Sequence, residues 1–163
     1  MNATDAPPEG LASYYESTYP RLWSYLRRLV PDAAAASDLA QEAFVRLLGS
    51  KRVALPEAER TAYLFTIATN LARRGWKDLK RDEQRRAEVR IDESHANDVV
   101  AVIDVSRALD TLSARERSIV WLAYAEGHDH RTIAGMVGVR EVSIKVLLHR
   151  ARKKLLTILG GDS

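Results

Sequence analysis

The clearest pattern of hydrophobic and polar positions lies near the C-terminal end of the chain. A short helical pattern there stops at Gly138, and its apolar residues are Ile133, Ala134 and Val137. A longer pattern follows, with apolar residues at intervals of three or four: Ile144, Leu148, Ala151 and Leu155. Such intervals place apolar side chains on one face of a helix. Two helices joined by a short glycine-containing turn predict a helix-turn-helix, whose second helix commonly reads DNA.

The charge of the same stretch favours this interpretation. Between residues 131 and 154 the only acidic residue is Glu141, and the basic ones are Arg131, Arg140, Lys145, Arg150, Arg152, Lys153 and Lys154. Basic side chains at this density are typical of a surface that binds phosphates. The alternative is a basic amphipathic helix of an ordinary bundle, with charges that are only solvated. Because turn, spacing and charge coincide, duplex DNA is the favoured partner, while the activity on DNA stays open.

Helical spacing also dominates the N-terminal half. An apolar ladder begins at Leu11 and contains Pro20, which predicts a kink or two abutting helices. Asp32 is well placed to cap a second helix, from Ala33 to about Leu48. A third helix is expected to begin after Pro56 and to continue into a strongly basic stretch around Trp76. Cations around an aromatic ring suit nucleic acid, although the alternative is a core tryptophan beside a solvated helix.

The segments between these patterns predict the domain organisation. Residues 1–10 are small and polar and predict a disordered tail. Residues 88–103 are acidic at their start and lack a sustained apolar stripe, which predicts a flexible linker between domains at 11–87 and 104–163. In the second domain, Ser113 and Glu116 form a capping-box pattern that begins another helix. Because no alternating run indicates a strand, the chain is predicted to be all-α, with two small helical domains.

Composition narrows the functional classes. A hydrophobic share of 46% is enough for a core, which argues against a disordered protein. The chain has no cysteine, so disulfides and thiolate metal sites are excluded, and a reducing cytoplasm is expected. No apolar run approaches the roughly 18 residues that span a bilayer, and no signal pattern opens the sequence. We therefore expect a cytoplasmic protein without membrane insertion.

Three segments resemble bacterial sigma factors of the extracytoplasmic-function group. They lie at residues 38–48 (DLAQEAFVRLL), 63–74 (YLFTIATNLARR) and 109–155, which contains the helix-turn-helix. The resemblance covers about residues 11–157, in the family's order and with an acidic linker in the family's place. It implies a non-catalytic initiation factor, without cofactor or metal, that binds core RNA polymerase, places it on a promoter and opens the duplex. Such factors are commonly held inactive by an anti-sigma protein.

The resemblance also implies three binding surfaces. The polymerase-binding helix would use four side chains: Asp38, Gln41, Glu42 and Arg46. The minus-ten promoter element would bind to two segments, the loop at 49–56, which captures a flipped base, and a melting helix from Thr61 to Arg81. The contacting residues would be Lys51, Arg52, Asn70, Arg73, Arg74, Trp76, Lys77, Lys80 and Arg81. The minus-thirty-five element would meet the helix-turn-helix through these: Arg131, Thr132, Arg140, Glu141, Val142, Ser143, Lys145, Val146, His149, Arg150 and Lys153. The acidic linker is similar to the segment that threads the polymerase cleft.

The sequence departs from the family at the start of the second helix of this motif. The family has a capping serine where this chain has Arg140, a small serine at Val146 and an arginine at Leu147. Measured from Ile144 at the centre of the buried face, Val142 and Val146 lie at roughly 160° and 200°, so both point outward. They can pack on thymine methyls or on a helix of an inhibitory partner. We expect fewer hydrogen bonds to bases here than in the family and more dependence on phosphate contacts.

Two other functional classes remain as alternatives. A promoter-binding regulator would use the same helix-turn-helix, but it would have no need for Asp38, Glu42 and a basic melting helix. A metal-dependent enzyme would have to use His128 and His130, which flank Asp129. Histidines beside a helix-capping aspartate are more commonly turn residues than metal ligands.

Overall fold

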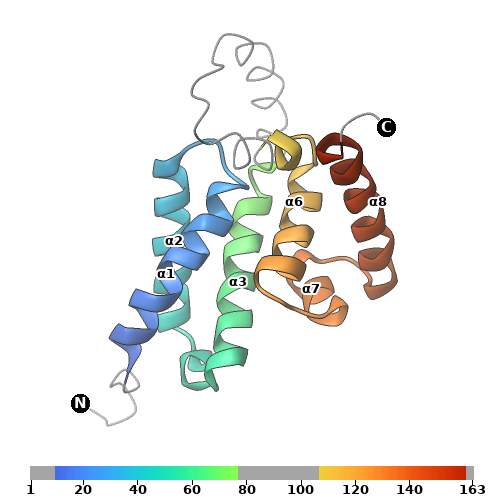
Figure 1. Cartoon of the computed structure of the whole chain (residues 1–163). Helices are drawn as coiled ribbons and strands as arrows, with labels where there is room; N and C mark the ends of the chain where they lie inside the picture. Colours follow the sequence, from blue (N-terminus) through green and yellow to red (C-terminus); the bar gives the residue numbers. More distant parts are fainter. Residues whose placement is uncertain (1–9, 77–106, 161–163) are drawn as a thin grey trace, which may run out of the picture. The chain divides into compact units, whose positions relative to one another are not determined.

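The computed structural model describes residues 10–76 and 107–160, and every regular element in these two ranges is helical. Contacts divide the chain into two units, Met1–Arg74 and Gly75–Ser163, each with its own core. Figure 1 shows α1, α2 and α3 in the first unit and α6, α7 and α8 in the second. The all-helical fold class is therefore confirmed. The tail at 1–9 and the linker at 88–103 lie outside the described residues, so these limits stay predictions.

The first unit is a three-helix bundle of α1 (Leu11–Arg27), α2 (Ala33–Leu48) and α3 (Glu57–Arg73). Each helix packs on the other two, and a short 3-10 helix, η2 (Lys51–Ala54), joins α2 to α3. The largest fully buried side chains of this bundle are Leu22, Tyr25, Leu26, Leu29, Leu47, Leu64 and Phe65. Hydroxyl pairs tie α1 to α3, at 2.9 Å between Tyr14 and Thr61 and at 2.7 Å between Tyr25 and Thr69. These bonds satisfy polar groups that burial would otherwise penalise.

The ends of these helices test three sequence predictions. The Ala35 amide donates to Asp32 Oδ1 at 2.8 Å, so the predicted cap of α2 is confirmed. Pro20 lies inside α1, which is a single helix, so the prediction of two abutting helices is wrong. Core packing of residues before and after Pro20 offsets its lost hydrogen bond, about 3 kcal/mol. The prediction of a single helix from Thr61 to Arg81 is also wrong, because α3 ends at Arg73 and a turn at 74–75 follows. Gly75 favours this break, since a glycine inside a helix costs about 1 kcal/mol relative to alanine.

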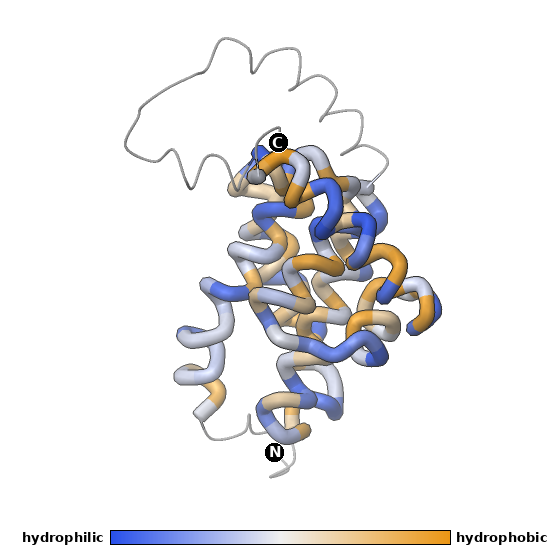
Figure 2. Tube along the Cα trace, turned by 45° about the vertical axis from the view of Figure 1, so that its right-hand side comes forward, coloured by the Kyte–Doolittle hydropathy of each residue, from blue (hydrophilic) through white to orange (hydrophobic). Residues whose placement is uncertain are grey.

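The second unit contains α6 (Ala114–Val120), a π-helical turn η5 (Trp121–Ala125), α7 (His130–Val137) and α8 (Glu141–Leu159). The predicted capping box is confirmed: Ser113 and Glu116 exchange hydrogen bonds at 2.9 and 3.1 Å. The helices pack on one another through a compact apolar core, whose members include Leu112, Ile119, Leu122, Ile133, Met136, Ile144 and Ala151. In Figure 2 hydrophobic and hydrophilic stretches alternate along the trace, as expected for helices with one buried face.

The helix-turn-helix is confirmed in α7 and α8. Asp129 caps α7 by accepting the Thr132 amide at 2.8 Å. Gly138 ends the helix with a φ of 72°, a left-handed conformation that glycine adopts without strain. The buried face of α8 is the predicted one, with Ile144, Leu148 and Ala151 inside and Leu155 half-buried. The opposite face of α8 is thereby left to solvent.

Candidate polymerase and DNA interfaces

The outward face of α2 carries the predicted polymerase-binding residues. Asp38, Gln41, Glu42 and Arg46 are all exposed. Arg46 Nη2 lies 2.7 Å from Glu42 Oε1, and both side chains are about half exposed, at 46% and 47%. An exposed pair one helical turn apart contributes little to stability. The structure therefore keeps these carboxylates accessible without needing them for the fold.

Two apolar residues share this face and were not predicted as site residues. Val45 is 66% exposed and Leu48 is 51% exposed. They follow Asp38 and Gln41 at intervals of three and four residues, so all four lie on one side of α2. The same spacing in the sequence could have identified them, but apolar residues of a helix are first assigned to its core. A face with carboxylates and exposed apolar side chains suits a protein partner better than a solvated surface.

The loop between α2 and α3 is held in place by its neighbours. Ser50 accepts the Arg52 amide at 3.0 Å, and Arg60 donates to the Val53 carbonyl at 3.1 Å. The Arg52 guanidinium lies 4.6 Å from the centre of the Tyr63 ring, a cation–π contact. Lys51 and Arg52 are both exposed. The loop thus presents two cations from a fixed backbone.

The C-terminal end of α3 carries the next predicted DNA contacts. Asn70 and Arg74 are exposed, and Arg73 Nη1 donates to Asn70 Oδ1 at 3.2 Å. Trp76 is half-buried. The remaining predicted residues of this surface, Lys77, Lys80 and Arg81, lie outside the described residues. The structure therefore brings Asn70 and Arg73 together and leaves the basic continuation a prediction.

The predicted residues of the helix-turn-helix lie on its solvent side. Thr132 and Ser143 are half-buried, and the others are exposed: Arg131, Arg140, Glu141, Val142, Lys145, Val146, His149, Arg150 and Lys153. Arg140 is the residue before α8 and makes no side-chain hydrogen bond to the helix, although its carbonyl accepts the Ser143 amide at 3.0 Å. The predicted loss of the capping hydroxyl is therefore confirmed.

This missing cap leads to a stability prediction. Arg140→Ser should raise the free energy of unfolding by about 1 kcal/mol, because a serine hydroxyl would accept an amide of the first turn of α8. The measurement is a denaturant titration beside wild type. Arg140→Ala is the matched control, since it removes the same charge without adding an acceptor. An equal gain from both variants would mean that charge, and not capping, limits the stability of this helix start.

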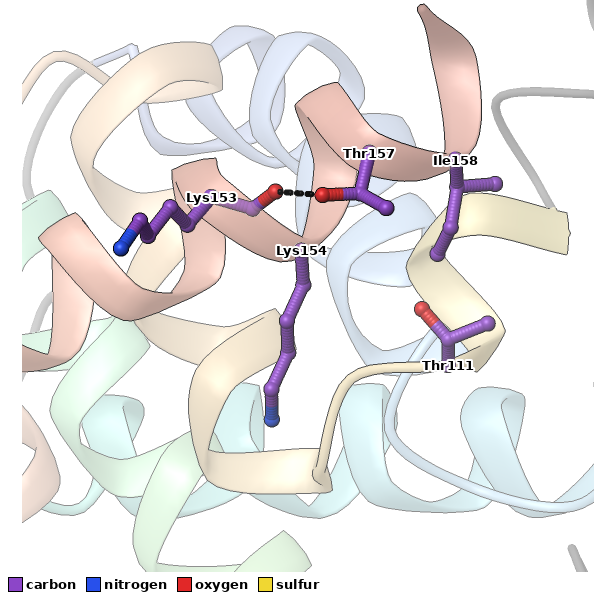
Figure 3. Close-up of a pocket in the computed structure, with 5 residues that line it drawn as sticks. All are labelled: Thr111, Lys153, Lys154, Thr157 and Ile158. Atoms are coloured by element: carbon purple, nitrogen blue, oxygen red, sulfur yellow. Dashed lines mark hydrogen bonds between the residues drawn. The ribbon is translucent and has the colours of Figure 1, made fainter. Parts of the chain in front are cut away.

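Lys154, one of the basic residues of the stretch that the sequence assigns to phosphate binding, is half exposed but pairs with Glu116 of the same unit. Its ammonium lies 2.9 Å from Glu116 Oε1 and 3.0 Å from Oε2. Figure 3 shows that Lys153 and Lys154 leave α8 in different directions, beside a hollow of about 350 Å³ that Thr111, Thr157 and Ile158 also line. Both threonine hydroxyls in this hollow donate hydrogen bonds to backbone carbonyls, Thr111 to Ala108 at 2.6 Å and Thr157 to Lys153 at 2.9 Å. The ion pair with Glu116 thus partly neutralises one cation of the basic stretch.

The Glu116–Lys154 pair predicts a pH-dependent stability. Burial of Glu116 raises its pKa, but the Ser113 amide and the Lys154 ammonium outweigh burial and hold the pKa below its ordinary value of 4.5. A pKa that is lower in the folded chain stabilises it above about pH 4.5, and this contribution is lost as the pH falls further. Lys154→Met should lower the free energy of unfolding at pH 7 by about 1 kcal/mol, a figure reduced because the lysine is half exposed.

Unfolding at pH 7 and pH 3 measures this effect. The difference between wild type and Lys154→Met should shrink as the pH falls from 7 toward 3, because protonation of Glu116 removes the charge that Lys154 pairs with. Lys153→Met, which removes the neighbouring exposed charge, should change stability little at either pH. A loss of the same size from both lysine variants would show that the ion pair with Glu116 is not the cause.

The region around His128 and His130 already has a structural role. The Asp129 carboxylate between them accepts the Thr132 amide, and this bond lowers its pKa. The His128 amide donates to the Leu122 carbonyl at 2.9 Å and closes the turn before α7. Among the described residues, no three histidine, cysteine, aspartate or glutamate side chains gather where they could hold a metal ion. Nor is any helix in those ranges long and apolar enough to cross a membrane.

Comparison with known families and proteins identifies the family of this chain. The family model for sigma-70 region 2 matches residues 14–82, and the model for sigma-70 region 4 matches residues 103–155. The chain is similar to the ECF RNA polymerase sigma factor SigL of Mycobacterium tuberculosis, at 30% identity over 160 residues, covering 89% of this chain and 86% of SigL. It is also similar to the ECF RNA polymerase sigma factor EcfG of Rhodopseudomonas palustris, at 30% identity over 152 residues, covering 88% and 81%.

A solved structure has the same fold. The sigma factor RpoE of Bartonella quintana, determined in complex with the anti-sigma factor NepR, aligns with a TM-score of 0.71 and 23% sequence identity. The alignment covers 96% of this chain and all of that one. The match of region 2 answers the alternative of a stand-alone helix-turn-helix regulator, because such a regulator would not carry this region. The chain belongs to the extracytoplasmic-function sigma factors, which direct core RNA polymerase to promoters in bacterial transcription initiation.

Proposed function

We propose that three surfaces of this sigma factor divide the work of initiation. The outward face of α2 binds core polymerase, the loop and helix end of the first unit open the minus-ten element, and the helix-turn-helix holds the duplex minus-thirty-five element. The observation that carries the proposal is the placement of charge. The exposed carboxylates of Asp38 and Glu42 lie on α2 beside Arg46, and groups of exposed cations lie on η2, at the end of α3 and along α8.

Polymerase binding is proposed for Asp38, Gln41, Glu42 and Arg46. Exposed carboxylates favour docking on a basic surface, where opposite charge sets orientation and association rate. Val45 and Leu48 extend this face, since they are exposed beside the carboxylates. Burial of the two apolar side chains on docking would add hydrophobic free energy to the electrostatic attraction.

Strand opening is proposed for Lys51, Arg52, Asn70, Arg73 and Arg74. Extrusion of a base from a duplex costs a few kcal/mol of stacking, so the protein must bind the separated strand tightly. Cations on a braced loop and at a helix end can hold its phosphates. Four further residues belong to this proposal by the family resemblance: Trp76, Lys77, Lys80 and Arg81.

Duplex binding is proposed for the helix-turn-helix, with α8 in the major groove and Arg131 and Thr132 of α7 at the phosphates. Arg150 and Lys153, on the later turns of α8, are further phosphate contacts. The proposed domain limits are 11–87 and 104–163, with an acidic linker between them. In this scheme the chain contributes no catalytic group, because polymerase performs the chemistry, and it works in the bacterial cytoplasm.

Control by an anti-sigma protein is part of the proposal. It is supported by the RpoE structural neighbour, which was determined in complex with NepR. An inhibitor of this kind would have to compete with polymerase or DNA for the surfaces named above.

Separation of strand opening from binding tests the proposed division. Holoenzyme carrying Arg73→Ala and Arg74→Ala should bind core polymerase like wild type but form open complexes on duplex promoter DNA about tenfold more slowly, because cations that hold the opened strand are lost. On a template with an unpaired minus-ten segment, the two holoenzymes should differ much less. Arg107→Ala/Arg115→Ala is the matched control, since it removes two exposed charges from the other unit. Equal defects on duplex and unpaired templates would contradict a role in opening.

A further inference from the structure

The outward stripe of α8 begins with two exposed valines. Val142 is 72% exposed and Val146 is 49% exposed. They lie one turn apart in the first two turns of the helix, opposite the fully buried Ile144. Neither contributes to the core, so the fold does not require an apolar residue at these positions. A ligand that buries them would supply such a requirement.

The surroundings of the valines identify the kind of ligand. Within three residues of one or the other lie the exposed Arg140, Lys145 and His149 and one acid, Glu141, and further along α8 Arg150 and Lys153 are exposed. On an ideal helix Lys153 lies at roughly 180° from the buried face, in line with the valines. An apolar strip bordered by cations is complementary to duplex DNA, which has phosphates at its edges and less polar groups on the groove floor. An apolar partner helix would leave these cations desolvated without a counter-charge.

One group on the floor of the major groove suits a valine. Base edges there present hydrogen-bond donors and acceptors, which valine cannot use, and the C5-methyl of thymine, which it can. The two valines are separated by about 6 Å along the helix axis, and stacked base pairs are about 3.4 Å apart. A helix that lies along the groove would therefore place them over bases one or two steps apart.

We propose that Val142 and Val146 are specificity-determining residues that select thymines in the upstream element by contact with their methyl groups. The inference rests on the proposed duplex-binding role of α8. Base selection then depends on methyl contact at these two positions, while Arg150 and Lys153 supply affinity that does not depend on sequence. An apolar contact of this kind discriminates less sharply than a bidentate hydrogen-bonded pair.

The test removes the methyl groups and nothing else. Holoenzyme of the full chain with core polymerase first selects its upstream element from a duplex library randomised in that segment. Each thymine of the selected element is then replaced by deoxyuridine, which lacks the methyl and keeps every hydrogen-bonding group. Binding to wild-type holoenzyme should fall about fourfold at each of two positions, the effect expected from one buried methyl, and change little elsewhere.

Variants of the two valines assign the positions. Val142→Ala should abolish the preference for thymine over deoxyuridine at one position, and Val146→Ala should abolish it at the other. Both substitutions replace an exposed side chain with the best helix former, so the variants are expected to fold. Leu156→Ala is the matched control, because Leu156 is 71% exposed on the same helix and lies outside the first two turns.

The outcomes separate this inference from the function on which it rests. Methyl selection is wrong, and the proposed sigma-factor function stands, in either of two cases. In the first, the holoenzyme starts transcription but the selected element lacks two thymines one or two steps apart; in the second, DNA with deoxyuridine binds as well as DNA with thymine. If the valine variants keep the wild-type preference for thymine, other residues read the methyls. If the variants instead weaken binding of a protein inhibitor and leave DNA binding unchanged, the valines belong to that partner's interface. Failure to start transcription at all would contradict the proposed function itself.

Discussion

Asp38→Arg/Glu42→Arg should weaken binding to core polymerase at least 100-fold while leaving the chain as stable as wild type. Both carboxylates are exposed, and Glu42 pairs with Arg46 of the same helix at 2.7 Å. Loss of that pair costs at most about 0.5 kcal/mol. At the interface, however, two attractive charges become repulsive, which costs several kcal/mol and slows association. The measurement is equilibrium binding to core polymerase at two salt concentrations, together with a thermal melt.

Two comparisons make this prediction specific to the α2 face. Glu57→Arg/Glu59→Arg changes net charge by the same amount in the first turn of α3, where both residues are exposed, and should bind core nearly as well as wild type. The defect of the α2 variant should also grow smaller at high salt, because screening weakens repulsion between exposed charges. Equal binding of wild type and the α2 variant would show that this helix is not the polymerase contact.

Val45→Asp/Leu48→Asp should weaken core binding about 30-fold through lost hydrophobic burial. These side chains are 66% and 51% exposed in the free chain, so their replacement costs the fold little apart from a lower helix propensity. In the complex each buried aliphatic side chain contributes about 1–2 kcal/mol, and an aspartate would in addition lose its hydration. The loss should depend much less on salt than that of the double arginine variant.

The apolar and charged contributions to core binding can thus be separated by measuring the affinity of each variant at low and high salt. Tyr124→Asp is a matched control for exposed apolar surface, because Tyr124 is 58% exposed on η5 of the other unit. If Val45→Asp/Leu48→Asp binds core like wild type, the interface is confined to the charged residues of α2. If Tyr124→Asp binds core as weakly as Val45→Asp/Leu48→Asp, a general loss of exposed apolar surface, and not the α2 face, would account for the weaker binding.

The helices of this chain could be predicted well because local patterns determine them. Asp32, Ser113 and Asp129 each cap the helix that the sequence assigns to them, and Gly138 ends α7 where an achiral residue was needed. The buried face of α8 follows directly from its spacing of apolar residues. Such signals act within one or two turns, so they survive whatever the rest of the chain does.

The failures involve tertiary packing. Pro20 was expected to kink its helix or to separate two abutting helices, but α1 continues through it with core residues on both sides. Lys154 was included in the basic stretch expected to bind phosphates, although it pairs with Glu116, 38 residues earlier in the chain. Val45 and Leu48 were assigned no role, because a sequence shows that a residue is apolar but not that it is exposed. Each of these depends on contacts between elements, which periodicity does not contain.

The central claim is that this chain converts core polymerase into an enzyme that starts at chosen promoters. Run-off transcription tests it most directly, with core polymerase of the source bacterium, genomic DNA fragments as templates, and the chain present or absent. We expect discrete transcripts that require both proteins and disappear with Asp38→Arg/Glu42→Arg. Transcripts that are the same with and without the chain, or a chain that binds DNA fragments equally well in the absence of core polymerase, would contradict the account.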